Sequence, residues 1–149
     1  MRVALLRVLA VVGLAQLAAT AVQAQSVKTL FEKYNMLDTF AADCTKPVGA
    51  QNVYLVHRAL GEQVQRDMLD GPTSVYQVHV IESATGLGPN EIKVVMKSHR
   101  GGSNVTLVYR AERDRLRVLD SITDAGRQLI SGGRILSSNR EAPWFNRCK

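Results

Sequence analysis

The residues best suited to chemistry in this chain are arginines in its second half. Arg113, Arg115 and Arg117 stand at alternate positions around one predicted hairpin. Because residues of one parity share a strand face, we expect these guanidinium groups to line one side of the hairpin. Arginine forks pair well with phosphate and carboxylate groups. The pattern therefore predicts either a binding site for an anionic partner or a solvated outer face of a strand.

Trp144 and Phe145 form the only adjacent aromatic pair in the chain. Two interpretations of this pair are open. The rings could stack on a ligand at the mouth of a binding site, which makes Trp144 a candidate ligand-binding residue beside the arginines. Alternatively, the pair closes one end of a hydrophobic core.

No catalytic motif accompanies these residues. The chain has no Gly-x-Ser-x-Gly elbow, no His-Glu-x-x-His helix and no phosphate-binding glycine loop. His57, His79 and His99 show no metal-ligand spacing, and we expect them to face solvent or a sheet rim instead of acting as general bases. We predict a protein that is not an enzyme, with no catalytic residue, cofactor or metal site.

The first 24 residues have the three-part layout of a secretory signal peptide. Arg2 and Arg7 precede an uncharged apolar run from about Val8 to Ala21, and a small-residue cleavage site ends at Ala24. The alternative, an uncleaved anchor, would need roughly 20 apolar residues to cross a bilayer. We therefore predict a periplasmic or secreted domain over residues 25–149, with no integral membrane segment after cleavage.

Export makes a disulfide between the two cysteines possible, because disulfides persist in oxidising compartments. Cys44 and Cys148 lie near opposite ends of the mature chain, and we predict that they bond to each other. Closing a loop of about 100 residues stabilises by up to about 4.7 kcal/mol in the chain-entropy model. The alternatives, a reactive thiol pair or half of a metal site, have no supporting motif. A bridge over nearly the whole mature chain also indicates a single domain.

Hydrophobic periodicity predicts one helix followed by strands. The segment "SVKTLFEKYNML" has apolar residues at helical spacing near the mature N-terminus. Later segments alternate with period two, and the residues expected to face inward include Met96, Leu107 and Tyr109. In "RLRVLDSI", Leu116, Val118 and Ile122 continue this alternation. Glycine pairs at 101–102 and 132–133 predict a tight hairpin and a bulge or bend, respectively.

We count seven to nine short, consecutive antiparallel strands. Closure into an up-and-down barrel removes the exposed edges of such a sheet most completely. A disulfide between the first strand region and the C-terminal segment favours closure. The predicted fold is a mainly β, single antiparallel barrel with one short N-terminal helix, and a two-sheet sandwich is the alternative.

The segment "LDTFAADCTKP" resembles the "G-x-W-A-x-D-C-S-x-P" opening of small exported bacterial proteins of unknown function. It resembles more distantly the "G-x-W" first strand of lipocalin-like barrels, with Asp38 in place of the glycine and Phe40 in place of the tryptophan. The first resemblance extends to "GPNEI" and "PWFNRCK". It supports the predicted fold and export, and it assigns no functional residues.

Two classes of function follow from these features. A lipocalin-like barrel could carry a small apolar or amphipathic ligand. Alternatively, the arginine-rich face could bind an anionic envelope component or a protein, since residues 100–149 hold 10 Lys and Arg against 5 Asp and Glu. Nucleic acid is not an expected partner, because the chain carries an export signal and lacks interleaved aromatic residues. The sequence does not indicate an oligomeric state.

Overall fold

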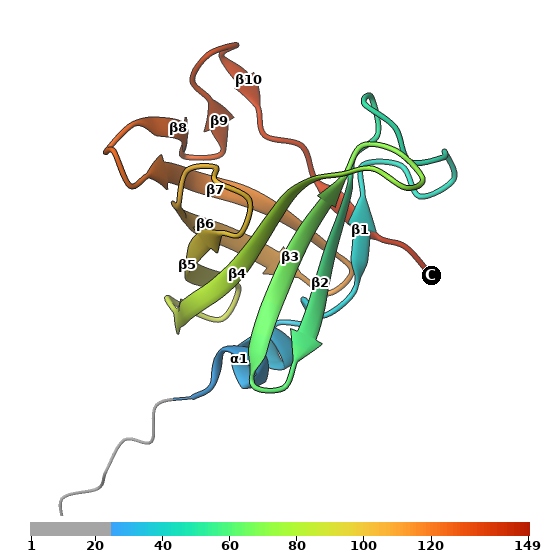
Figure 1. Ribbon diagram of the computed structural model, residues 1–149. Coiled ribbons are helices and arrows are strands. Elements are labelled where there is room, and N and C mark those ends of the chain that lie inside the picture. The colour runs from blue at the N-terminus through green and yellow to red at the C-terminus, as the bar shows by residue number, and fades with distance from the viewer. Residues whose placement is uncertain (1–24) are drawn as a thin grey trace, which may run out of the picture.

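Eight antiparallel strands close into a barrel in the computed structural model, which describes residues 25–149 (Figure 1). Each strand from β1 to β7 pairs with the next, and β11 closes the barrel between β7 and β1. The predicted barrel is confirmed, in place of the two-sheet sandwich. The predicted signal peptide lies outside the described residues. The barrel strands are β1 (Thr39–Ala41), β2 (Tyr54–Leu60), β3 (Gln63–Leu69), β4 (Val75–Gly86), β5 (Glu91–Ser98), β6 (Val105–Glu112), β7 (Arg115–Thr123) and β11 (Phe145–Arg147).

Three short strands leave the barrel after β7 before the chain returns as β11 (Figure 1). They are β8 (Gln128–Ser131), β9 (Arg134–Ile135) and β10 (Arg140–Glu141). Gly132 and Gly133 join β8 to β9 with φ angles of 55° and 78°. Two positive φ angles are typical of a two-residue hairpin turn, so this pair makes a turn and not the predicted bulge or bend. Gly101 also has a positive φ angle, of 74°, but it lies in a longer link between β5 and β6. The predicted tight hairpin at Gly101 and Gly102 is therefore wrong.

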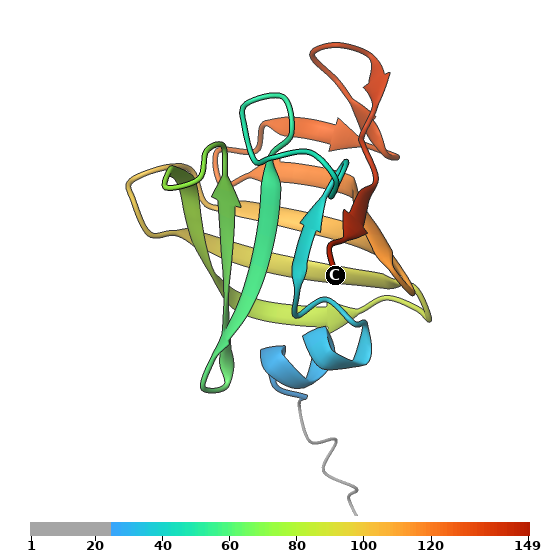
Figure 2. The same cartoon turned by 90° about the vertical axis from the view of Figure 1, so that its right-hand side faces the viewer.

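The predicted helix is α1 (Val27–Lys33), which lies across one end of the barrel (Figure 2). Ser26 caps its N-terminus, since its Oγ accepts a hydrogen bond from the backbone N–H of Thr29 at 3.2 Å. Just after the helix, the Tyr34 hydroxyl donates a 2.6 Å hydrogen bond to the carbonyl of Gly88 in the β4–β5 turn. Over residues 25–149, the structure contains no helix with the length and apolar character needed to span a bilayer.

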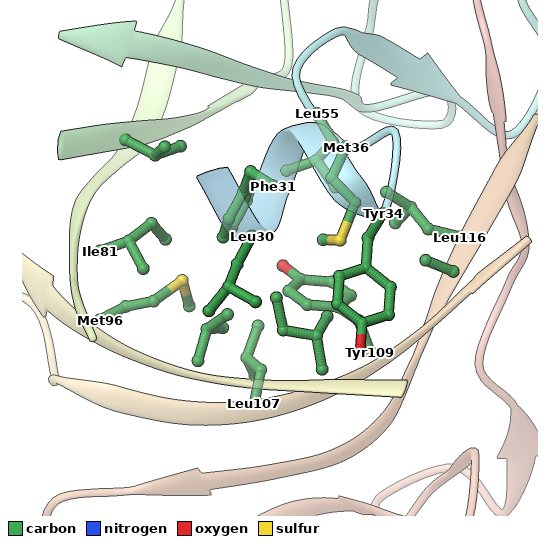
Figure 3. Packing of buried hydrophobic residues seen from close by; sticks show 14 of the residues in the cluster. Leu30, Phe31, Tyr34, Met36, Leu55, Ile81, Met96, Leu107, Tyr109 and Leu116 are labelled. Atoms are coloured by element: carbon green, nitrogen blue, oxygen red, sulfur yellow. The ribbon is translucent and has the colours of Figure 1, made fainter. Parts of the chain in front are cut away.

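The hydrophobic core lies inside the barrel and packs against α1 (Figure 3). Leu30 and Phe31 point from the helix into the barrel and meet residues from the strands. Met96, Leu107 and Tyr109 are buried on the inner face, which confirms the predicted alternation in β5 and β6. The largest fully buried side chains are Tyr109, Phe31, Phe40, Met36, Leu55, Ile81, Ile92, Met96, Leu116, Val64 and Val94.

A register shift in β7 changes which of its residues face inward. Tyr109 pairs with Val118, whereas the preceding Val108 pairs with Asp120, so one extra residue enters β7 at this point. Beyond the shift, Ser121 and Thr123 are buried, whereas Ile122 is 40% exposed. The prediction that Ile122 continues the inward-facing row is therefore wrong, because an inserted residue reverses the side-chain parity.

Cys44 and Cys148 form the predicted pair, with their Sγ atoms 2.03 Å apart. Next to this pair, the backbone N–H of Cys148 donates to the carbonyl of Thr39 at 2.9 Å. The bridge holds β11 beside β1 at the seam where the barrel closes. The C-terminal segment is thereby fixed to the beginning of the domain, as expected from the spacing of the two cysteines.

Candidate ligand-binding site

The end of the barrel opposite α1 contains a cavity of about 410 Å³. This volume falls within the range of small-molecule sites, about 300 to 1,000 Å³. The cavity is bounded by the inner faces of β3 to β7 and by the loops at this end of the barrel. Its walls are Arg66, His79, Met96, Ser98, Val105, Leu107, Ser121, Thr123 and Leu129, and its mouth is formed by Tyr76, Gln77, Arg100, Gly102, Ser103 and Arg127.

Arg66 is the most unusual residue of the cavity, because it is a charged side chain that is only 7% exposed. It forms no ion pair with any carboxylate of residues 25–149. Its Nη2 lies 2.9 Å from Sδ of Met68, and its Nε has no hydrogen-bond partner within the described part of the chain. Buried charges are normally paired, so Arg66 presents an uncompensated positive charge to the interior.

The neighbouring carboxylate cannot neutralise Arg66, because successive side chains in a strand point to opposite faces. Asp67 lies on the outer face of β3, where it pairs with Arg58 and accepts a 2.7 Å hydrogen bond from Nε2 of Gln65. The carboxylate of Asp67 is thus paired with Arg58 and not with Arg66. The inner guanidinium group faces the cavity.

A row of polar residues crosses the cavity wall next to Arg66. In the register of the sheet, Arg66 pairs with His79 on β4, and His79 pairs with Ser98 on β5. Burial, and then the Arg66 charge, lower the pKa of His79, which favours a neutral imidazole at this position. The Ser98 hydroxyl accepts a 2.9 Å hydrogen bond from the backbone N–H of Gly102, which ties the β5–β6 loop to the cavity rim.

His57 on β2 is the other neighbour of Arg66 in the sheet, since the two residues pair in the register of β2 and β3, and its ring borders the hydrophobic core. Its Nδ1 is 2.8 Å from the carbonyl of Met36, and its ring makes edge contacts with Phe31 and Tyr109 at centroid distances of 5.2 and 6.0 Å. Burial, with a further contribution from the Arg66 charge, lowers the pKa of His57 to about 3. The neutral ring therefore donates from Nδ1 to Met36. This burial corrects the prediction that His57 and His79 face solvent or the rim, whereas His99 is exposed.

A second lobe of about 200 Å³ adjoins the first, and it shares Arg66, Leu107 and Ser121 with it. Except for Arg66 and Ser121, the residues around this lobe are apolar. They are Met68, Leu107, Val118, Ile130, Ala142, Pro143 and Phe145. The barrel thus has one lobe of mixed polar and apolar lining and one apolar lobe, and the buried Arg66 borders both.

The structure brings together three of the four residues predicted to bind a ligand, on the outside of the barrel. The guanidinium groups of Arg115 and Arg117 lie 4.3 and 5.0 Å from the ring centroid of Trp144. Arg115 also pairs with Glu112 at 2.6 Å, and Arg117 approaches Glu141 at 3.9 Å. Arg113 stands apart in the β6–β7 turn, with a side chain that is 95% exposed. These arginines are engaged with their own neighbours, and an anion-binding role for this face stays a prediction.

Sequence reasoning missed Arg66, although a signal for it was present. In "QVQRDML", Val64, Arg66 and Met68 share one parity, so a charged residue occupies the apolar row of a predicted strand. Within residues 25–149, no group of three or more His, Cys, Asp or Glu side chains is placed to hold a metal ion. The candidate site is therefore built on arginine, hydroxyl and apolar groups.

The fold and the cavity define a closed antiparallel β-barrel with internal space for a small molecule. Comparison of the chain with models of protein families, with curated proteins and with solved structures finds no match.

Proposed function

We propose that this protein binds a small amphipathic molecule inside its barrel. The observation that carries the proposal is the pair of adjoining lobes, of about 410 and 200 Å³, within a barrel that also holds a packed hydrophobic core. Small eight-stranded barrels are often filled by their own side chains. Here the sequence places Ser98, Ser121 and Thr123 on the inner face, and these short side chains leave space.

The lining of the two lobes supports an amphipathic ligand over a purely apolar one. Ligand sites are typically apolar surfaces with a few polar groups that fix orientation. The apolar lobe provides the first feature, and Arg66 with His79 and Ser121 provides the second. The lipocalin-like character expected from the sequence is consistent with this role.

The proposed place of action is the periplasm or the outside of the cell. The Cys44–Cys148 pair supports this location, since structural disulfides persist in oxidising compartments. A protein that binds a small molecule there would act as a carrier or as a sensor of that molecule.

Native mass spectrometry of the protein, purified from the periplasm of a bacterial host, tests the proposal. We expect a reproducible adduct in the small-molecule mass range that is lost on denaturation. Ser121→Phe fills the junction of the lobes and should abolish the adduct. Ser83→Phe, on the exposed part of β4, is the matched control and should retain it.

Two results would contradict the proposal. One is an adduct carried equally by Ser121→Phe and the wild-type protein, since the ligand would then bind elsewhere. The other is a wild-type protein that acquires no adduct even after incubation with single-chain amphiphiles of either charge.

A further inference from the structure

We propose that the ligand is an amphipathic monoanion whose carboxylate group pairs with Arg66 and whose apolar part fills the lobe beside it. This inference rests on the proposed function and adds the chemical class of the ligand. Its central observation is a buried arginine, Arg66, which is 7% exposed and borders both the lobe of mixed lining and the apolar lobe.

An arginine side chain stays charged in proteins, so Arg66 cannot avoid the cost of burial by losing its proton. A buried charge is stabilised mainly by an opposite charge with good hydrogen-bond geometry. The residues around the two lobes include no Asp or Glu. The protein itself therefore provides no counter-charge inside the cavity, and an anionic ligand would provide one.

The acidic residues nearest in sequence do not change this conclusion. Asp67 points to the outer face and pairs with Arg58. Asp70 belongs to the β3–β4 turn near Tyr76 at the mouth, where burial raises the pKa of the Tyr76 hydroxyl, the Arg66 charge opposes this shift and the Asp70 charge adds to it. Neither carboxylate forms an ion pair with Arg66 within the described part of the chain.

The interior holds one positive charge, which selects a monoanion over a dianion. Arg100 and Arg127 are exposed at the mouth, and Nη1 of Arg100 already donates to the carbonyl of Val75 at 3.1 Å. His79 is held neutral beside Arg66 by burial and by the Arg66 charge, which lower its pKa. A dianion at Arg66 would leave one buried charge uncompensated, which is strongly unfavourable.

The shape of the guanidinium group favours a carboxylate. Its planar fork can donate two parallel hydrogen bonds to the two oxygens of a carboxylate, and charge-assisted pairs of this kind are among the strongest. Ser121 borders both lobes, as Arg66 does, and adds a hydroxyl donor. The apolar part of the ligand then lies among Met68, Val118 and Phe145.

Calorimetric titration with two probes of equal length, decanoate and 1-decanol, tests the inference on the full mature protein. Hydrogen bonds to charged groups favour decanoate by about ten-fold to one hundred-fold in affinity over decanol. Arg66→Met should remove this preference while leaving the affinity for decanol unchanged. The control, Arg140→Met, removes an exposed arginine on β10 and should keep the preference. Decyl phosphate, which approaches a dianion near neutral pH, should bind more weakly than decanoate.

The outcomes separate the two proposals. If wild-type protein binds decanoate and decanol equally, or if Arg66→Met keeps the preference, the pairing with Arg66 is wrong and the binding barrel stands. If decyl phosphate binds more tightly than decanoate, the ligand is not a monoanion. Binding of neither decanoate nor decanol would overturn both proposals.

A measurement on the wild-type protein alone keeps the inference testable should Arg66→Met fail to fold. The Nε–H resonance of Arg66 should shift on addition of decanoate and stay in place on addition of decanol. An Arg66 resonance that does not respond to saturating decanoate would overturn the pairing.

Discussion

Arg66 on β3 and His79 on β4 lie directly opposite each other in the sheet, and both side chains are buried on the inner face of the barrel. Only Arg66 carries a charge there, because burial and the adjacent guanidinium group lower the pKa of His79. A permanent cation next to a neutral imidazole sets the electrostatic character of the cavity. The same cation also acts on His57, which pairs with Arg66 from β2 on its other side.

His57 should make the protein sensitive to mild acid. Its pKa is lowered from 6.5 to about 3, so the unfolded chain binds a proton below pH 6.5 that the folded chain excludes. The stability contributed by neutral His57 is complete above pH 6.5 and is lost as the pH falls from 6.5 toward 3. We expect this residue alone to lower the free energy of unfolding by about 1 kcal/mol between about pH 7 and pH 5.5.

Urea unfolding of wild-type protein and His57→Phe at the two pH values measures this contribution. His79 lowers stability in the same direction in both proteins, so it cancels in the comparison. The stability difference between the two proteins should shrink by about 1 kcal/mol at the lower pH. An unchanged difference would show that His57 does not titrate on unfolding.

The hydrogen bond from the Tyr34 hydroxyl to the β4–β5 turn requires a residue without a side chain at Gly86. A Cβ atom at Gly86 would lie 2.6 Å from the Tyr34 hydroxyl, which donates to the carbonyl of Gly88. Gly86→Ala should therefore displace this hydroxyl and lower the free energy of unfolding by about 1 to 2 kcal/mol. The matched control is Gly88→Ala, whose Cβ meets nothing within 4 Å and which should change stability by less than about 0.5 kcal/mol. Equal effects in thermal unfolding would refute the steric explanation.

The Cys44–Cys148 bridge should contribute strongly to stability, because few backbone pairs hold β11 in place. Only Phe145 and Asn146 pair with β7, and only Asn146 and Arg147 pair with β1. Cys44→Ser with Cys148→Ser should lower the free energy of unfolding by about 2 to 5 kcal/mol. Reduction of the wild-type protein should reproduce this loss, and amide exchange should rise first in β11. A loss below about 1 kcal/mol would show that strand pairing alone closes the barrel.

The arginines around the β6–β7 hairpin should differ sharply in their effect on stability. Arg117 is 18% exposed at its side chain and packs between Trp144 and Gly133, whereas the Arg113 side chain is 95% exposed. Arg117→Ser should cost about 1 to 2 kcal/mol through lost packing and cation–π contact, and Arg113→Ser less than about 0.5 kcal/mol. Chemical unfolding followed by the fluorescence of Trp144, the single tryptophan, measures both. Equal losses would place the two arginines in equivalent environments, contrary to the structure.

The barrel could be predicted from the sequence because buried and more exposed positions alternate clearly along two of its long strands, β5 and β6. Met96, Leu107 and Tyr109 occupy the inward parity of β5 and β6, and each is buried. Such patterns are local, so they need no knowledge of the rest of the fold. The two cysteines then supplied the long-range information that favoured closure.

The candidate site could not be predicted, because it depends on relationships between distant segments. Arg66 is visible as a charge in an apolar row, but that it pairs with no carboxylate of residues 25–149 depends on which face of β3 presents Asp67. The inward position of Ser121 depends on one extra residue in β7, which no period-two pattern indicates. His57 is buried because the segment after α1 brings the Met36 carbonyl to its ring.

The helix across one end of the barrel has a kinetic consequence for any molecule held inside. Because Leu30, Phe31 and Met36 fill the interior behind α1, a molecule can enter and leave only past the loops at the opposite end. Uptake and release then share one route, and a molecule cannot pass through the barrel from end to end. Movements of the β5–β6 loop, which Ser98 holds to the rim through Gly102, would therefore change the rates of uptake and of release together.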